Sequence, residues 1–147
     1  MVWLELFNLL HFIGLAWGVG GATAAAIISA KSEKNPEIAH AAMKIIPSIS
    51  KLIWFGIILL IISGIGLSYS VKWPINTKLL LIKHILYALI IIIGIAIGII
   101  IKRLHILAPK QKETPSIQFL RAKKKLKFLS LINLILWYTI TVLSVFI

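Results

Sequence analysis

Four long apolar segments dominate this chain of 147 residues and leave it few ways to fold. They cover about 3–30, 52–70, 79–101 and 126–147. Each is close to or above the ~20 residues with which a helix crosses the ~30 Å hydrocarbon core of a bilayer. Because 60% of all residues are hydrophobic, too few polar residues remain to cover a soluble domain. The sequence predicts an integral membrane protein with a single four-helix transmembrane domain over 1–147.

The apolar segments are continuous runs rich in Ile and Leu, without the alternation of polar and apolar residues that marks a membrane β-barrel. We therefore expect an all-α fold, an antiparallel bundle of four transmembrane helices. No Lys or Arg precedes segment 3–30, and it is longer than the apolar core of a signal peptide, so it is expected to remain as the first helix.

Two connecting segments have helical character of their own. Between Asn35 and Ser50 we expect a short cytoplasmic interfacial helix, with Pro36 in its first turn. Pro47 is expected to separate this helix from the second span or to kink the chain there. Residues 117–128 are expected to form an amphipathic lead into the fourth span.

Basic residues are concentrated in two of the three connections. These two connections and their flanks hold 13 of the 16 Lys and Arg residues: Lys31, Lys34, Lys44, Lys51, Lys102, Arg103, Lys110, Lys112, Arg121, Lys123, Lys124, Lys125 and Lys127. The positive-inside rule then places the first and third connections in the cytoplasm and both termini outside a cytoplasmic membrane. Juxtamembrane lysines also attract anionic lipid, so the net charge of +12 does not lead us to expect a nucleic-acid partner.

Two histidines lie inside the apolar segments, where an imidazole is costly and usually marks a ligand, proton or metal site. His11 belongs to the first segment and His84 to the third. Both segments enter from the outside in the topology above. At 1.5 Å per residue His11 lies about 10–12 Å and His84 about 9–10 Å along its helix, so the two rings share a depth.

Small residues follow each histidine. At offsets of 3, 7, 10 and 14 from His11 come Gly14, Gly18, Gly21 and Ala25, and at 10 and 14 from His84 come Gly94 and Gly98. Such stripes let a helix or a flat ligand approach closely, so we expect both rings to point into the bundle. Either Asn8 or Asn133 could orient a ring through its second nitrogen.

Two neutral imidazoles that face each other across a bundle can ligate the iron of a b-type haem. We expect one haem b between the first and third helices near the outer leaflet, with His11 and His84 as metal ligands and Gly14 and Gly18 beside the macrocycle. Its propionates would need cations, which Lys78, Lys83 or Lys72 can supply. Cysteine is absent, which excludes thiolate metal sites and disulfides.

Other roles stay open for these side chains. Each histidine can simply hydrogen-bond a carbonyl or hydroxyl group and hold helices together, or can handle a metal ion or protons. Lys83 points about 100° away from His84 and either extends to the headgroups or serves as an axial amine or a propionate partner. His40 and His105, on the cytoplasmic side, would form the site of a second haem.

The first helix reads His11-Phe-Ile-Gly-Leu-Ala-Trp17-Gly-Val-Gly20-Gly21, and the third opens with Lys78-Leu-Leu-Leu-Ile-Lys83. The first run resembles both the membrane domain of copper-resistance protein D and the short haem-containing protoporphyrinogen oxidase family, and the second run resembles the copper-resistance membrane domain. The resemblance to the protoporphyrinogen oxidase family implies that a histidine of the first helix and a lysine of the third serve haem binding or activity. By position these are His11 and Lys83.

The function we expect from the sequence is electron transfer or haem-dependent redox chemistry in the membrane. Two His ligands would favour electron transfer, whereas His11 alone would leave an open position suited to catalysis by a haem-dependent oxidoreductase. The alternatives are a copper-handling or other metal-handling membrane protein, and a non-catalytic small subunit of a membrane complex. The expected partners are the lipid bilayer, a redox partner in the membrane, and a second copy or a larger complex.

Overall fold

The computed structural model describes residues 2–32, 35–70, 77–108 and 114–146, and in these ranges its regular structure is entirely helical. The helices are α1 (Val2–Ser32), α2 (Pro36–Ser70), α3 (Thr77–Leu107) and α4 (Ile117–Leu143). Each of the four is long and apolar enough to cross a membrane. The predicted architecture of four helical spans is therefore confirmed.

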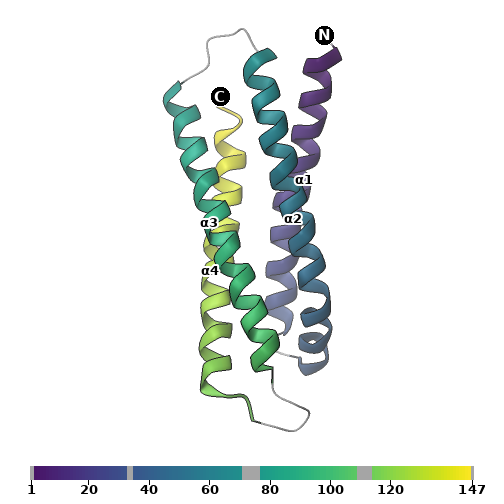
Figure 1. Ribbon diagram of the computed structural model, residues 1–147, viewed down its shortest axis with the longest axis vertical. Coiled ribbons are helices and arrows are strands. Elements are labelled where there is room, and N and C mark those ends of the chain that lie inside the picture. Colours follow the sequence, from purple (N-terminus) through teal and green to yellow (C-terminus); the bar gives the residue numbers. More distant parts are fainter. Residues whose placement is uncertain (1, 33–34, 71–76, 109–113, 147) are drawn as a thin grey trace.

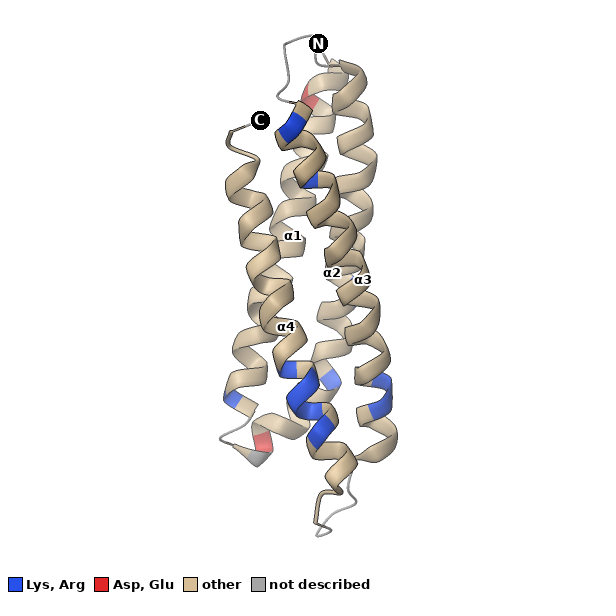
Figure 2. Cartoon of the chain, turned by 90° about the vertical axis from the view of Figure 1, so that its left-hand side faces the viewer, with Lys and Arg blue, Asp and Glu red and all other residues tan. Residues whose placement is uncertain are grey.

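The four helices lie side by side and run alternately up and down (Figure 1). Both ends of the chain lie at the same end of the bundle, which we call the termini end. The last turns of α1 and α3 and the first turns of α2 and α4 lie at the opposite end. Most Lys and Arg residues gather at that opposite end (Figure 2), which we call the basic end.

Side-chain caps start two of the helices. The Oδ1 atom of Asn35 accepts hydrogen bonds from the backbone N–H groups of Glu37 at 2.9 Å and Ile38 at 3.4 Å, and Pro36 occupies the first position of α2. The Ser116 hydroxyl oxygen accepts from the backbone N–H of Phe119 at 3.2 Å. Each cap supplies an acceptor for an N–H group that the first helical turn leaves free.

The separate interfacial helix expected at 35–50 is wrong, because α2 runs without interruption from Pro36 to Ser70 and contains Pro47. A proline removes one backbone hydrogen bond, but packing against neighbouring helices supports the helix through it. In the same way α4 begins at Ile117, so the expected amphipathic lead belongs to the helix itself.

The closest helix pair is α1 with α2, whose backbones meet at glycines. A Cβ atom added to Gly56 would lie 2.8 Å from the carbonyl oxygen of Gly14 and 2.9 Å from the backbone nitrogen of Gly18. Any side chain there would force the two helices apart. Beyond this pair, α3 packs mainly on α4, α4 also contacts α1, and α2 meets α3 at only a few points.

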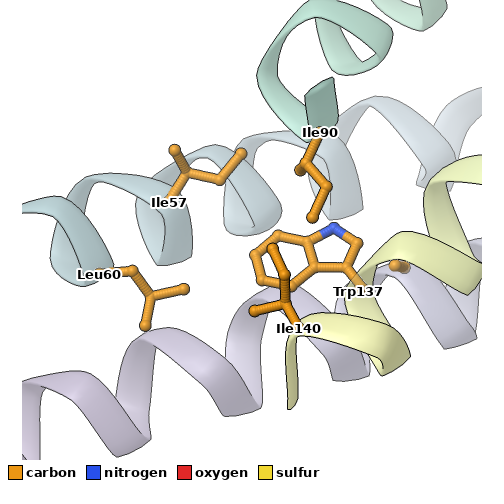
Figure 3. Packing of buried hydrophobic residues seen from close by; sticks show 6 residues of the cluster. Ile57, Leu60, Ile90, Trp137 and Ile140 are labelled. Atoms are coloured by element: carbon orange, nitrogen blue, oxygen red, sulfur yellow. The ribbon is translucent and has the colours of Figure 1, made fainter. Parts of the chain in front are cut away.

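The indole of Trp137 on α4 fills the centre of the bundle and is completely buried. Figure 3 shows it among Ile57 and Leu60 of α2, Ile90 of α3 and Ile140 of its own helix. The ring also lies against α1, where a Cβ on Gly18 would overlap it. A single large side chain therefore links all four helices.

Large apolar side chains cover the outside of the bundle. On α3, for example, Ile92, Ile95 and Ile99 are all more than half exposed, at 61%, 51% and 63%. An outer surface of this kind faces hydrocarbon rather than water. The helices therefore contact the lipid bilayer, as the sequence predicts.

Candidate functional site

A polar pair joins α1 and α2 in the half of the bundle nearer the termini end. The Nδ1 atom of His11 lies 2.9 Å from the hydroxyl oxygen of Ser63. The His11 ring is half-buried, whereas Ser63 is completely buried. The Ser63 hydroxyl is also within 3.3 Å of the backbone carbonyl oxygen of Leu60.

This arrangement favours one form of the His11 ring. When the Ser63 hydroxyl donates its hydrogen to the carbonyl of Leu60, its oxygen accepts the Nδ1–H of His11. The other ring nitrogen, Nε2, then carries a lone pair. Among the residues that the structure describes, Nε2 has no hydrogen-bond partner, so it is available to a ligand.

The pair belongs to a regular ladder along the antiparallel α1–α2 interface. Moving from the termini end inwards, Phe7 lies against Gly66, His11 bonds Ser63, and Gly14 meets Leu60 and Gly56. Steps of three or four residues on each helix keep these side chains on the shared face. The serine was missing from the residues singled out in the sequence, because a lone serine in an apolar helix carries no pattern that marks it.

Lys83 of α3 is the second ionisable group of this region. It is half-buried, and it shares the inward face of its helix with Tyr87 and Ile90, four and seven residues further on. Within the described residues no carboxylate balances Lys83.

His84 lies elsewhere. Its ring is exposed on the outer surface of α3, and its Nδ1 atom bonds the carbonyl oxygen of Leu80, one turn earlier in the same helix, at 2.7 Å. The structure therefore does not bring His84 and His11 together, and the expected pair of histidine ligands is not favoured by this geometry. Lys83 takes the inward position that was expected for His84.

The helical offsets explain this exchange. Ten residues along a helix fall about 80° short of three full turns. Gly94 therefore does not lie on the same face as His84. From Lys83 the step to Gly94 is eleven residues, which returns to within about 20° of the same face. The small residue at 94 thus marks the direction of Lys83.

The glycines of α1 are used for helix packing. A Cβ on Gly14 would lie 2.8 Å from Cγ of Leu60, and one on Gly18 would overlap the ring of Trp137. Neighbouring side chains already fill the places where a flat cofactor was expected beside these two residues. The stripe of small residues on α1 does allow close approach, but the molecules that approach it are the neighbouring helices α2 and α4.

The remaining predicted site residues are scattered. Lys78 is exposed in the first turn of α3, and Lys72 lies outside the described residues. His40 and His105 are both exposed at the basic end, and of the two His105 lines a partly open hollow there. Among the described residues no three His, Cys, Asp or Glu side chains come together as a metal site.

The two asparagines expected to orient an imidazole do not do so in this geometry. Asn8 is exposed, and the ring of His11 is held by Ser63. Asn133 is buried at 7% exposure on α4, and its Oδ1 atom has no hydrogen-bond partner among the described residues.

The chain matches a known protein family. Residues 5–146 match the family described as "Predicted integral membrane protein (DUF2269)", and because this covers nearly the whole chain, the chain belongs to that family. No curated protein and no solved structure matches it. The resemblance to copper-resistance protein D and to the protoporphyrinogen oxidases gains no support from these comparisons and stays a prediction.

Proposed function

We propose that this member of the DUF2269 family of integral membrane proteins binds a b-type haem, with His11 as an axial ligand, and serves electron transfer or haem-dependent redox chemistry. The observation that supports the proposal best is the arrangement of two side chains. A half-buried imidazole on α1 is held by a buried serine, and a half-buried lysine, Lys83, lies on α3 in the same half of the bundle.

The first argument concerns the ring of His11. Histidines that ligate a metal through one nitrogen usually donate a hydrogen bond from the other, which fixes the tautomer and the ring orientation. The Ser63 hydroxyl oxygen, 2.9 Å from Nδ1, supplies that partner here. The ring is therefore preorganised to offer Nε2 to an iron.

The second argument concerns charge. An ammonium group in a membrane segment is stabilised when a counter-charge lies near it, and no carboxylate among the described residues plays that part for Lys83. A ligand that brings both a metal for the imidazole and negative groups for the ammonium satisfies both side chains at once. Haem has this combination, because its iron is accompanied by two propionates.

The residues expected from the sequence fit a haem only in part. His11 and Lys83 fit, whereas His84 points outward and the space beside Gly14 and Gly18 is taken. The proposal therefore assigns one histidine ligand and gives Lys83 the role of propionate partner or second axial ligand. A bound haem would supply one-electron redox chemistry.

The visible spectrum of the purified protein tests this. After expression in haem-replete cells, we expect a reduced-minus-oxidised haem signal and haem content near one per chain. His11→Ala should lose most of the haem, while the matched control His84→Ala should keep it, since that ring lies outside the bundle. Lys83→Ala should shift the spectrum or weaken retention.

Two results would refute the proposal in this form. Wild-type protein without haem would remove the function altogether. Equal haem loss in His84→Ala and His11→Ala would keep the haem but restore the two-histidine ligation expected from the sequence.

We also propose how the protein is oriented: the termini end lies at the outer face of the cytoplasmic membrane. It rests on the gathering of Lys and Arg at the basic end (Figure 2), because basic connections are retained in the cytoplasm. The haem would then lie nearer the outer leaflet, where a redox partner in the membrane can approach it.

A further inference from the structure

Two adjoining hollows, both partly open to the outside, lie between the helices from the centre of the bundle towards the basic end, away from His11. The one nearer the basic end has a volume of about 120 Å³, and the deeper one about 60 Å³. They share four lining residues, one or more from each helix: Ser29, Ile46, Ile101 and Leu126. We call them the outer hollow and the deep hollow.

The hollows exist because small side chains face one another there. Ser32 of α1 and Ala39 and Ala42 of α2 line the outer hollow, and Ala25 of α1 and Gly94 of α3 line the deep one. Protein interiors are normally packed without voids of this size. Small residues on α1, α2 and α3 at these two levels therefore leave room for another molecule.

The polarity of the side chains on the inward face of α4 changes along these hollows. Lys123 lines the outer hollow, Leu126 lines both, and Ser130 and Asn133 line the deep one. These residues are three or four positions apart and so lie on one face. The order along the face is cation, apolar, hydroxyl and amide.

The two ends of the joined hollows differ in polarity: the outer end carries cationic or basic side chains, and the deep end carries a hydrogen-bond acceptor. Lys123 and His105 line the outer hollow, and no acidic side chain among the described residues lines either hollow. At the far end the Oδ1 atom of Asn133 is buried and has no hydrogen-bond partner among the described residues. A buried amide without a partner is costly, so a donor is expected to meet it when the hollow is filled.

From these observations we infer that the two hollows form a binding site for a single-chain anionic amphiphile that carries a hydrogen-bond donor at its far end. Its carboxylate or phosphate lies at Lys123, its apolar body passes Ile46, Ile101 and Leu126, and its donor reaches Asn133. The span is set by the ten residues between Lys123 and Asn133, about 15 Å of helix. A chain of about twelve carbons covers that length.

The site is separate from the proposed haem site, because Trp137 fills the centre of the bundle between them. Removal of His11 leaves every residue of the hollows in place. The two proposals can therefore fail independently.

Binding of defined amphiphiles to the full chain in nanodiscs of neutral lipid tests the inference. We expect 12-hydroxydodecanoate to bind several-fold more tightly than dodecanoate, and dodecanoate more tightly than dodecanol. Lys123→Gln should weaken both acids several-fold and leave the alcohol unchanged. The matched control is Lys124→Gln, which removes the same charge from an exposed neighbour that lines neither hollow.

The far end has its own test. Asn133→Leu should abolish the difference between 12-hydroxydodecanoate and dodecanoate while dodecanoate still binds, and retained dodecanoate binding also shows that the variant is folded. The inference is overturned if Lys124→Gln weakens the acids as much as Lys123→Gln does. It is equally overturned if dodecanol binds as well as the acids, if none of the three binds, or if the hydroxyl gives wild-type protein no advantage.

Discussion

His11 of α1 and Ser63 of α2 are joined by a 2.9 Å hydrogen bond across the closest helix interface of the bundle. On both sides of the bond the two helices meet through glycines, at Gly66 nearer the termini end and at Gly14 and Gly56 further in. The hydrogen-bonded pair therefore lies between two close contacts of α1 with α2, one at Gly66 and one at Gly14 and Gly56. Such a position fixes the ring more firmly than the hydrogen bond alone would.

Ser63→Ala should lower the free energy of unfolding by about 0.5–1 kcal/mol, the range measured for hydrogen bonds between membrane helices. The reason is that His11 loses its partner at Nδ1. Thermal unfolding in detergent measures the change. Ser68→Ala is the matched control, since the exposed Ser68 bonds only the carbonyl of Gly64 in its own helix; an equal loss in both variants would contradict the inter-helix role.

Gly18→Ala should destabilise the bundle by about 1–3 kcal/mol, the usual cost of overpacking. The added methyl group would overlap the indole of Trp137, which is held on all sides. Gly20→Ala is the control, because nothing lies within 4 Å of a Cβ placed there. Chemical denaturation in mixed micelles compares them, and equal stability of the two variants would show that Trp137 does not lie against α1.

Tyr87→Phe should loosen the contact between α2 and α3. The Tyr87 hydroxyl donates to the carbonyl oxygen of Ile57 at 3.0 Å, in a place where the two helices otherwise meet at few points. We expect a loss of about 1 kcal/mol in stability and faster hydrogen exchange on α3. Tyr69→Phe serves as control because Tyr69 is 88% exposed; unchanged exchange in Tyr87→Phe would argue against this bond.

Single cysteines can establish the orientation, since the natural chain has none. With the termini end outside, Val145→Cys should react with a membrane-impermeant maleimide in intact cells, and Lys124→Cys should react only after lysis. Neither side chain is covered by the bundle, and the two lie near its opposite ends. The reverse labelling pattern would invert the orientation that the positive-inside rule predicts.

The sequence predicts the four spans well because hydrophobic length is what a bilayer demands of a helix. It predicts the starts of α2 and α4 poorly, since hydropathy marks the part in hydrocarbon and these two helices begin well before it. Residues 36–51 and 117–125 mix polar and basic side chains with apolar ones and are nevertheless helical, with Asn35 and Ser116 as caps. Local caps and packing decide those boundaries, and a hydropathy average does not register them.

The candidate site is predictable in part. The sequence identifies His11 and Lys83 as unusual, but it prefers His84 to Lys83 for the inward position. Neighbouring residues on a helix differ in direction by about 100°, so a small error in the estimated face exchanges one for the other. Ser63 and the filling of the glycine stripe depend on which helices become neighbours, and that information lies in the three-dimensional packing.

The unequal packing of the four helices has a consequence for how the protein is made. Because the glycine-lined contact between α1 and α2 needs nothing from later residues, this hairpin can form its interface while the rest of the chain is still being synthesised. α3 packs mainly on α4, and Trp137 of α4 reaches the α1–α2 pair in the centre. The bundle is therefore built from two hairpins that meet around one buried indole.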